Sequence, residues 1–258
     1  MKAAASLALA LVLVAAVVAA FALRPRLPAA ERGRRLAQRT GCFGCHGEGG
    51  LKGAANPGRE DGSVPGFEGD VMMYAKSLEE IRQWIHDGVT VGRSHSESWR
   101  EQRRRGALKM PAFGHRLSDP EIADLTAYVA AVSGMPEPDP SAAPGLERAE
   151  ALGCVGCHGA GGRLAGVNPG SLKGYVPSWE SDDFAELVRD RTEFQQWVEN
   201  GISERFDRNP FARWFLRRAV LHMPAYRDRL EPDDVDQLWA YVQWLRALPD
   251  SSLQLTHR

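Results

Sequence analysis

The stretch GCFGCHGEGGLKGAANPG at residues 41–58 recurs almost unchanged as GCVGCHGAGGRLAGVNPG at residues 153–170. These two copies contain all four cysteines of the 258-residue chain. The similarity continues to Met110-Pro111-Ala112, which matches Met223-Pro224-Ala225 with a single inserted residue between the copies. A long internal repeat of this kind predicts two copies of one structural unit.

The boundary between the copies is predicted from proline content. Residues 136–144 contain four prolines, which exclude a helix and favour an extended connection. We therefore expect an N-terminal segment over 1–29, a first domain over 30–135 (the first repeat), a linker over 136–144 and a second domain over 145–258 (the second repeat).

Both repeats carry helix signals and lack the alternating pattern of strands, so an all-α fold is expected. Helices are predicted over 30–40 and 145–152, leading into the cysteine motifs, and near 94–107 and 209–221. Capping boxes at Ser77–Glu80 and Thr192–Gln195 predict helices that end near Gly88 and Gly201, and Ser118 begins a further helix.

The N-terminal segment contains an uncharged stretch over residues 3–23, which as a helix would be about 30 Å long. A transmembrane anchor is therefore expected. The Ala20-Phe21-Ala22 sequence also fits the cleavage site of a secretory signal, so a cleaved signal stays open. Six arginines between residues 24 and 39 oppose export under the positive-inside rule. These arginines could form a solvated helix or contact anionic lipid headgroups.

The repeated Cys-x-x-Cys-His motif is the attachment motif of c-type haem. Two cysteines on one helical turn can form thioether bonds to a porphyrin, and the histidine can bind the iron from below. A zinc site would need four ligands, and a thioredoxin-like pair would need a βαβ context. Two disulfides would leave both histidines without a role. The motif therefore favours haem over these three alternatives.

A methionine followed by proline is the second expected iron ligand in each repeat. Thioether sulfur prefers reduced iron, so a His/Met pair raises the reduction potential. The other methionines of the first repeat are expected to fill the core, and the remaining histidines are expected at the surface. The expected haem-binding residues are Cys42, Cys45, His46, Met110, Cys154, Cys157, His158 and Met223, with His46, Met110, His158 and Met223 as iron ligands and no catalytic residue.

Residues 30–135 and 145–249 resemble class I cytochrome c domains, and the whole chain resembles membrane-anchored dihaem cytochromes c of bacteria. In that family a helix leads into the haem motif, a glycine-rich loop follows, a Met-Pro supplies the sixth ligand, and a terminal helix packs across the first. The resemblance implies two covalently bound haem c groups. It also implies attachment outside the cytoplasm, with haem domains in the periplasm, anchored at the inner membrane or released there after signal cleavage.

With both axial positions filled by the protein, the expected chemistry is one-electron transfer between redox partners rather than enzymatic turnover. A free carrier and a subunit of a larger respiratory or photosynthetic complex both remain open. A dihaem peroxidase-type enzyme is the alternative, but it needs an exchangeable ligand that the paired Met-Pro motifs argue against. The chain has 32 basic and 33 acidic residues, so nucleic acid is not an expected partner.

Arginines gather just before each Met-Pro, within residues 100–105 and 213–218. Three interpretations remain open for them: a solvated helix face, ion pairs with haem propionates, and docking of an acidic redox partner.

Overall fold

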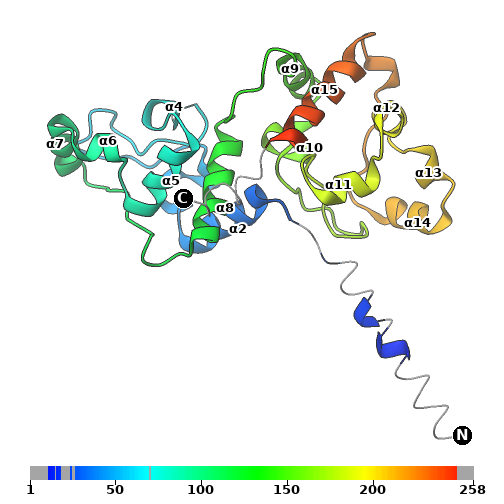
Figure 1. Ribbon diagram of the computed structural model, residues 1–258, viewed down its shortest axis with the longest axis horizontal. Helices are drawn as coiled ribbons and strands as arrows, with labels where there is room; N and C mark the ends of the chain where they lie inside the picture. Colours follow the sequence, from blue (N-terminus) through cyan, green and yellow to red (C-terminus); the bar gives the residue numbers. More distant parts are fainter. Residues whose placement is uncertain (1–10, 15, 19–23, 25–26, 70, 249–258) are drawn as a thin grey trace, which may run out of the picture. The chain divides into compact units, whose positions relative to one another are not determined.

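The computed structural model describes residues 11–14, 16–18, 24, 27–69 and 71–248. Throughout this part of the chain the regular elements are helices, and the β structure is limited to two isolated bridges, Ala55–Ser63 and Val167–Tyr175. Figure 1 shows the helices in chain order. The expected helical class is therefore correct.

The helices repeat in the same order along the two halves of the chain. Those of the first repeat are α2 (Ala29–Thr40), α3 (Phe43–His46), η1 (Glu48–Gly50), α4 (Val71–Tyr74), α5 (Leu78–Asp87), α6 (Val91–Ser94), α7 (Glu97–Arg105) and α8 (Asp119–Val132). Those of the second repeat are α9 (Ala143–Ala151), α10 (Val155–His158), η2 (Ala160–Gly162), α11 (Asp182–Leu187), α12 (Arg191–Asn200), α13 (Glu204–Asp207), α14 (Pro210–Arg218), η3 (Arg227–Arg229) and α15 (Asp234–Ala247).

The predicted fold class included an N-terminal transmembrane helix, and this part of the prediction is corrected by the structure. Among the described residues, no helix is long and apolar enough to cross a membrane. Most of the stretch 3–23 lies outside the described residues.

From residue 27 onward, the chain forms two compact units. One consists of residues 27–166, 177–181 and 230 onward, and the other of residues 167–176 and 182–229. This division does not test the linker predicted over residues 136–144, which stays a prediction.

The crossing of α2 and α8 organises the first repeat, and Figure 1 shows these helices side by side. At Gly33 the backbones approach so closely that a Cβ would lie 1.9 Å from the carbonyl oxygen of Asp124. Arg32 then pairs with the Asp124 carboxylate at 2.6 Å. Only a glycine at position 33 allows this approach.

The same arrangement joins α9 to α15. A Cβ at Gly145 would lie 2.0 Å from the carbonyl oxygen of Gln237, and Arg148 pairs with Asp234 at 2.7 Å. In each repeat, therefore, a glycine of the first helix allows the last helix to pack closely, and an arginine of the first helix forms an ion pair with it.

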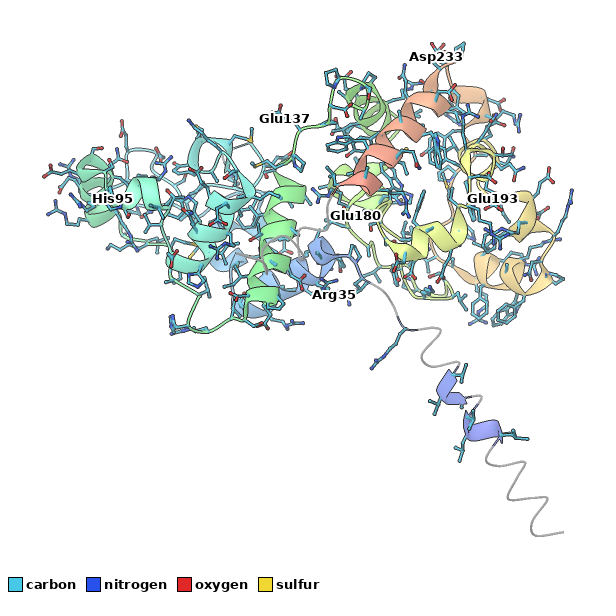
Figure 2. The ribbon with its side chains drawn as sticks, in the orientation of Figure 1. Arg35, His95, Glu137, Glu180, Glu193 and Asp233 are labelled. Carbon is cyan, nitrogen blue, oxygen red and sulfur yellow. The ribbon has the colours of Figure 1, made fainter. Side chains whose placement is uncertain are left out.

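The arginines that follow the apolar N-terminal stretch have structural roles in α2. Glu31 is fully buried, and its carboxylate accepts from Arg34 at 2.8 Å and from Arg35 at 2.8 Å. Arg35 is labelled on α2 in Figure 2. The guanidinium groups of these two arginines neutralise a buried carboxylate within the folded domain. The lipid-contact interpretation stays a prediction.

The core of the first repeat is built by aliphatic and aromatic side chains of α2, α5 and α8. Met135 is buried, as predicted for a core methionine. The same prediction was wrong for Met72 and Met73, which are 41% and 65% exposed. Both lie on α4, a four-residue helix that buries only Val71.

Helix caps agree with the sequence in two of three places. Ser77 accepts the Glu80 N–H at 3.2 Å at the start of α5, and the Glu121 carboxylate accepts the Ser118 N–H at 2.9 Å at the start of α8. The cap predicted at Thr192 was wrong. Asp190 begins α12 instead, because its carboxylate accepts the Glu193 N–H at 2.8 Å.

An ion pair between α12 and α13 holds part of the second repeat together. Arg205 donates to the Glu193 carboxylate at 2.6 and 2.8 Å and to the carbonyl oxygen of Leu187 at 3.3 Å. Glu193 is labelled in Figure 2. The hydrogen bonds from Arg205 lower the pKa of Glu193 to about 2.

Replacing Gly33 with alanine is expected to lower the free energy of unfolding by about 2–3 kcal/mol, because the new methyl group would collide with the α8 backbone. Gly92→Ala is the matched control, since a Cβ there meets nothing within 4 Å. Thermal denaturation followed by circular dichroism measures both. Equal stability of the two variants would contradict the close crossing.

Glu193→Gln is expected to lower the free energy of unfolding at pH 7 by about 1–2 kcal/mol, because Arg205 loses its charged partner. The depressed pKa means that this stabilisation is present above the unfolded-state pKa and is lost as the pH falls from about 4.5 towards 2. The variant should therefore lose stability less steeply over that range. Glu204→Gln removes the exposed pair with Arg208 and should change stability by less than about 0.5 kcal/mol.

Candidate haem site

A sharp turn from α2 into α3 presents the first Cys-x-x-Cys-His motif. Gly41 adopts a φ of 80° at the end of α2, and the Cys42 N–H donates to the carbonyl oxygen of Ala37 at 3.0 Å. The His46 N–H then donates to the Cys42 carbonyl at 3.0 Å, which closes one helical turn. Both thiols of this motif are free. The turn therefore places two thiols and an imidazole on adjacent positions of a single short helix.

One hydrogen bond orients the ring of His46. Its Nδ1 lies 2.8 Å from the carbonyl oxygen of Pro65. A carbonyl can only accept, so Nδ1 carries the proton and Nε2 keeps its lone pair for a metal. Burial lowers the pKa of His46, which keeps the ring neutral at pH 7.

The first repeat encloses a cavity of about 260 Å³. Cys42, Cys45, His46 and Met110 all line it, so the structure brings together the four residues that the sequence predicted for this repeat. Most of the remaining wall is hydrophobic and includes Phe67, Val71, Ile81, Ile85, Leu125 and Val129. Among the histidines of the described chain, only His46 reaches this wall.

The segment around Met110 is held by the end of α5. The Phe113 N–H donates to the Ile85 carbonyl at 3.0 Å, and the Gly114 N–H donates to the His86 carbonyl at 3.0 Å. Gly88 has a φ of 70°, and a Cβ there would lie 2.6 Å from the Met110 carbonyl oxygen. The close approach of a glycine thus lets the methionine segment pack on α5.

Asn56 is a positioning residue that the sequence analysis did not single out. Its side chain accepts the Leu108 N–H at 2.8 Å and donates to the Leu108 carbonyl at 3.0 Å, two residues before Met110. Asn168 holds Leu221 in the same way, at 2.9 and 3.0 Å. A signal is present in the sequence, since each asparagine begins a repeated Asn-Pro-Gly, at residues 56–58 and 168–170.

The second motif repeats the geometry of the first within the larger compact unit. Cys154, Cys157 and His158 lie on one turn ending in α10, and both thiols are free. His158 Nδ1 lies 2.9 Å from the Pro177 carbonyl oxygen, and burial lowers the pKa of this histidine. The ring of Trp179 packs 5.1 Å from that of His158.

Met223 lies in the other compact unit. There the Tyr226 N–H donates to the Val198 carbonyl at 3.0 Å, and a Cβ at Gly201 would lie 2.4 Å from the Met223 carbonyl oxygen. Its segment is therefore held on α12 as the Met110 segment is held on α5. The pairing of Met223 with His158 stays a prediction.

Two unsatisfied donors in the first repeat test whether a haem fits this cavity. Arg59 Nε and Trp99 Nε1 are buried without a hydrogen-bond partner, and both residues line the cavity. The Arg59 guanidinium lies 4.7 Å from the Trp99 ring centroid and pairs with Asp61 at 2.6 Å. A porphyrin carries carboxylates that could accept from both donors. The apolar wall, the thiols, the imidazole and the thioether therefore fit a haem c.

The site has the features by which c-type cytochromes hold haem, namely a Cys-x-x-Cys-His motif at a hydrophobic cavity. Comparisons with known proteins agree. Residues 28–129 match the family described as cytochrome C oxidase, cbb3-type, subunit III. The chain is 28% identical over 205 residues to the Cbb3-type cytochrome c oxidase subunit FixP of Azorhizobium caulinodans. The aligned region covers 79% of this chain and 56% of that protein.

The chain thus spans little more than half the length of this curated relative. No solved structure matches the chain. The similarities support a c-type cytochrome, a class that implies covalently bound haem c.

Asn56→Ala is expected to weaken binding of iron by Met110, because it removes both hydrogen bonds that hold Leu108, each worth about 0.5–1.5 kcal/mol. The oxidised, haem-loaded protein should lose intensity in its methionine-to-iron charge-transfer band. Gln102→Ala is the control, since it removes a surface hydrogen bond to Glu60. An unchanged band in the Asn56 variant would mean that this clamp does not position Met110.

Proposed function

We propose that this protein carries single electrons as the cytochrome subunit of a cbb3-type oxidase, with two covalently bound haem c groups. The observation that supports this most strongly is the cavity of the first repeat, where two free thiols, a neutral imidazole and a thioether line one hydrophobic space. The likeness to an oxidase subunit supports the choice of complex.

Each residue of the proposed site has a separate task. Cys42 and Cys45 anchor the macrocycle through thioether bonds. His46, oriented by Pro65, and Met110, positioned by Asn56, would hold the iron. Arg59 and Trp99 would donate to a propionate. The bound haem supplies an iron that changes oxidation state by one electron without exchanging a ligand.

The hydrophobic wall of the cavity is expected to raise the reduction potential of a bound haem iron. Leu125, Val129 and Phe67 exclude water from the iron, and a dry environment disfavours the additional positive charge of the oxidised iron. Thioether ligation acts in the same direction. We therefore infer a relatively high potential, which suits a donor to an oxidase.

A second haem is proposed at Cys154, Cys157, His158 and Met223. The support is the repeated motif, the matching histidine-to-carbonyl bonds at Pro65 and Pro177, and the matching asparagine clamps. Two haems in one chain would form a short relay. We place this relay in the periplasm, because haem attachment in the resembling cytochromes takes place outside the cytoplasm.

The test is a redox titration of the full chain, matured with the c-type haem machinery and followed by visible absorption. Two covalent haems per chain and a methionine-to-iron band from both are expected. Met110→Ala and Met223→Ala should each remove about half of the band and lower one potential, as expected for loss of the thioether ligand. Met73→Ala, at an exposed methionine, should change neither.

One covalent haem per chain would contradict the dihaem proposal. Rapid turnover of hydrogen peroxide by the correctly loaded protein would instead favour the peroxidase-type alternative. Reduction of a purified cbb3-type oxidase by the loaded protein tests the assignment to that complex.

A further inference from the structure

Helix α14 exposes hydrophobic side chains that its own unit does not cover. Phe211 is 63% exposed and Trp214 is 46% exposed. Phe215 joins them on the same face, with ring centroids 5.0 Å from Phe211 and 4.6 Å from Trp214. Figure 2 shows the side chains of α14 projecting away from the rest of this unit.

The exposed surface continues beyond the helix into two adjoining segments. Val220 and Leu221 are 67% and 42% exposed, and the Val220 N–H donates to the Pro169 carbonyl at 3.0 Å. This bond and the Asn168 clamp join the segment to the loop that carries two more exposed residues. We call the resulting surface the α14 patch, and it consists of Val167, Leu172, Phe211, Trp214, Val220 and Leu221.

The fold does not require this patch, because the first repeat builds the same helix without it. In the aligned helix α7, Ser98, Glu101 and Gln102 occupy the positions of Phe211, Trp214 and Phe215. Glu101 pairs there with Arg105 at 3.0 Å and forms an ordinary solvated surface. Large exposed apolar surfaces on soluble domains mark interaction sites.

Two arginines at the end of α14 give the patch a basic edge. Residues 208–227 contain five arginines and no aspartate or glutamate, and three of them, Arg208, Arg213 and Arg227, pair with Glu204, Asp207 and Glu199 outside this segment. The Arg218 guanidinium lies 4.6 Å from the Trp214 ring centroid, and Arg217 is exposed beside it. An aromatic centre with an arginine rim is typical of protein interfaces. Its complement is a surface with an apolar centre and acidic residues around it.

We propose that the α14 patch docks the acidic surface of a protein that exchanges electrons with the second repeat, namely a neighbouring subunit of the oxidase. This rests on the proposed function. Val220 and Leu221 lie within three residues of Met223, the expected iron ligand, so a protein on the patch would stand beside that haem. A bilayer on the same surface would separate the haem from its partners.

The proposed docking allows the transfer of one electron. One electron passes between the haem iron of the second repeat and a metal centre of the partner, so that one is oxidised and the other reduced. No bond forms or breaks. The two repeats thereby acquire different tasks, with the second as the one that meets the oxidase.

The test uses the haem-loaded full chain and a purified cbb3-type oxidase lacking this subunit, mixed in a stopped-flow instrument. One variant, Phe211→Ser with Trp214→Glu, copies the first repeat, and a second, Arg217→Glu with Arg218→Glu, reverses the rim charge. Val91→Ser removes a 58% exposed side chain of the first repeat as a control. Haem content and both potentials are measured first, to show that each variant is intact.

We expect the second-order rate constant to fall at least about tenfold in both patch variants and to remain unchanged in the control. The charge-reversed variant should also lose the decrease in rate that salt causes in the wild type. Wild-type rates in the patch variants would overturn the docking proposal and leave the proposed function standing. A wild-type protein that does not react with the oxidase would overturn both.

Two further measurements identify the other possible occupants. Patch-dependent retention of the protein on phosphatidylglycerol vesicles, with wild-type rates towards the oxidase, would make the patch a lipid-binding surface. A dimer in sedimentation velocity that the Phe211/Trp214 variant abolishes would make it a contact between two copies of this chain. Either result would overturn the proposal.

Discussion

The close crossing of the first and last helices of each repeat is the constraint on which the rest of the structure depends. Gly33 lets α8 lie directly on α2, and Gly145 does the same for α15 on α9. The crossing brings Tyr128 to the glycine-rich loop, where its hydroxyl donates to the Gly49 carbonyl at 2.9 Å. Burial raises the pKa of Tyr128 to about 12, so this hydroxyl remains a donor at any physiological pH.

The cavity follows from this framework because the helices alone do not fill the first repeat. Short helices around a small core bury limited apolar surface, and a haem of the right shape would supply what is missing. Arg59 Nε and Trp99 Nε1 are buried at the cavity wall without a hydrogen-bond partner, and the propionates of a haem could accept from both.

The two repeats share their framework and differ in their surroundings. Both hold a histidine by a proline carbonyl and the methionine segment by an asparagine. The first repeat has Arg59 and Trp99, where the alignment places Ser171 and Ala212 in the second. The second repeat has the aromatic α14 patch, where the first has polar side chains. The features that the two repeats share are those that the proposed haem sites need, and the differences lie around them.

The sequence by itself determined the helical class, the internal repeat and the two haem motifs, because these depend on local spacing and on the chemistry of cysteine, histidine and methionine. Helix starts were predictable where the cap was local, as at Ser77 and Ser118. The cap at Asp190 was missed because two start signals overlap there. The continuous apolar stretch predicted a transmembrane helix, but no helix of the described residues is long and apolar enough to cross a membrane.

Only the tertiary structure decided the features that join distant residues. The clamp between Asn56 and Leu108 spans 52 residues, and the bond between His46 and Pro65 spans 19. No local pattern encodes such distances. The structure also decided that arginines of α2 neutralise Glu31 and that the aromatic residues of α14 face outward, because burial depends on which elements pack together and not on the identity of a side chain.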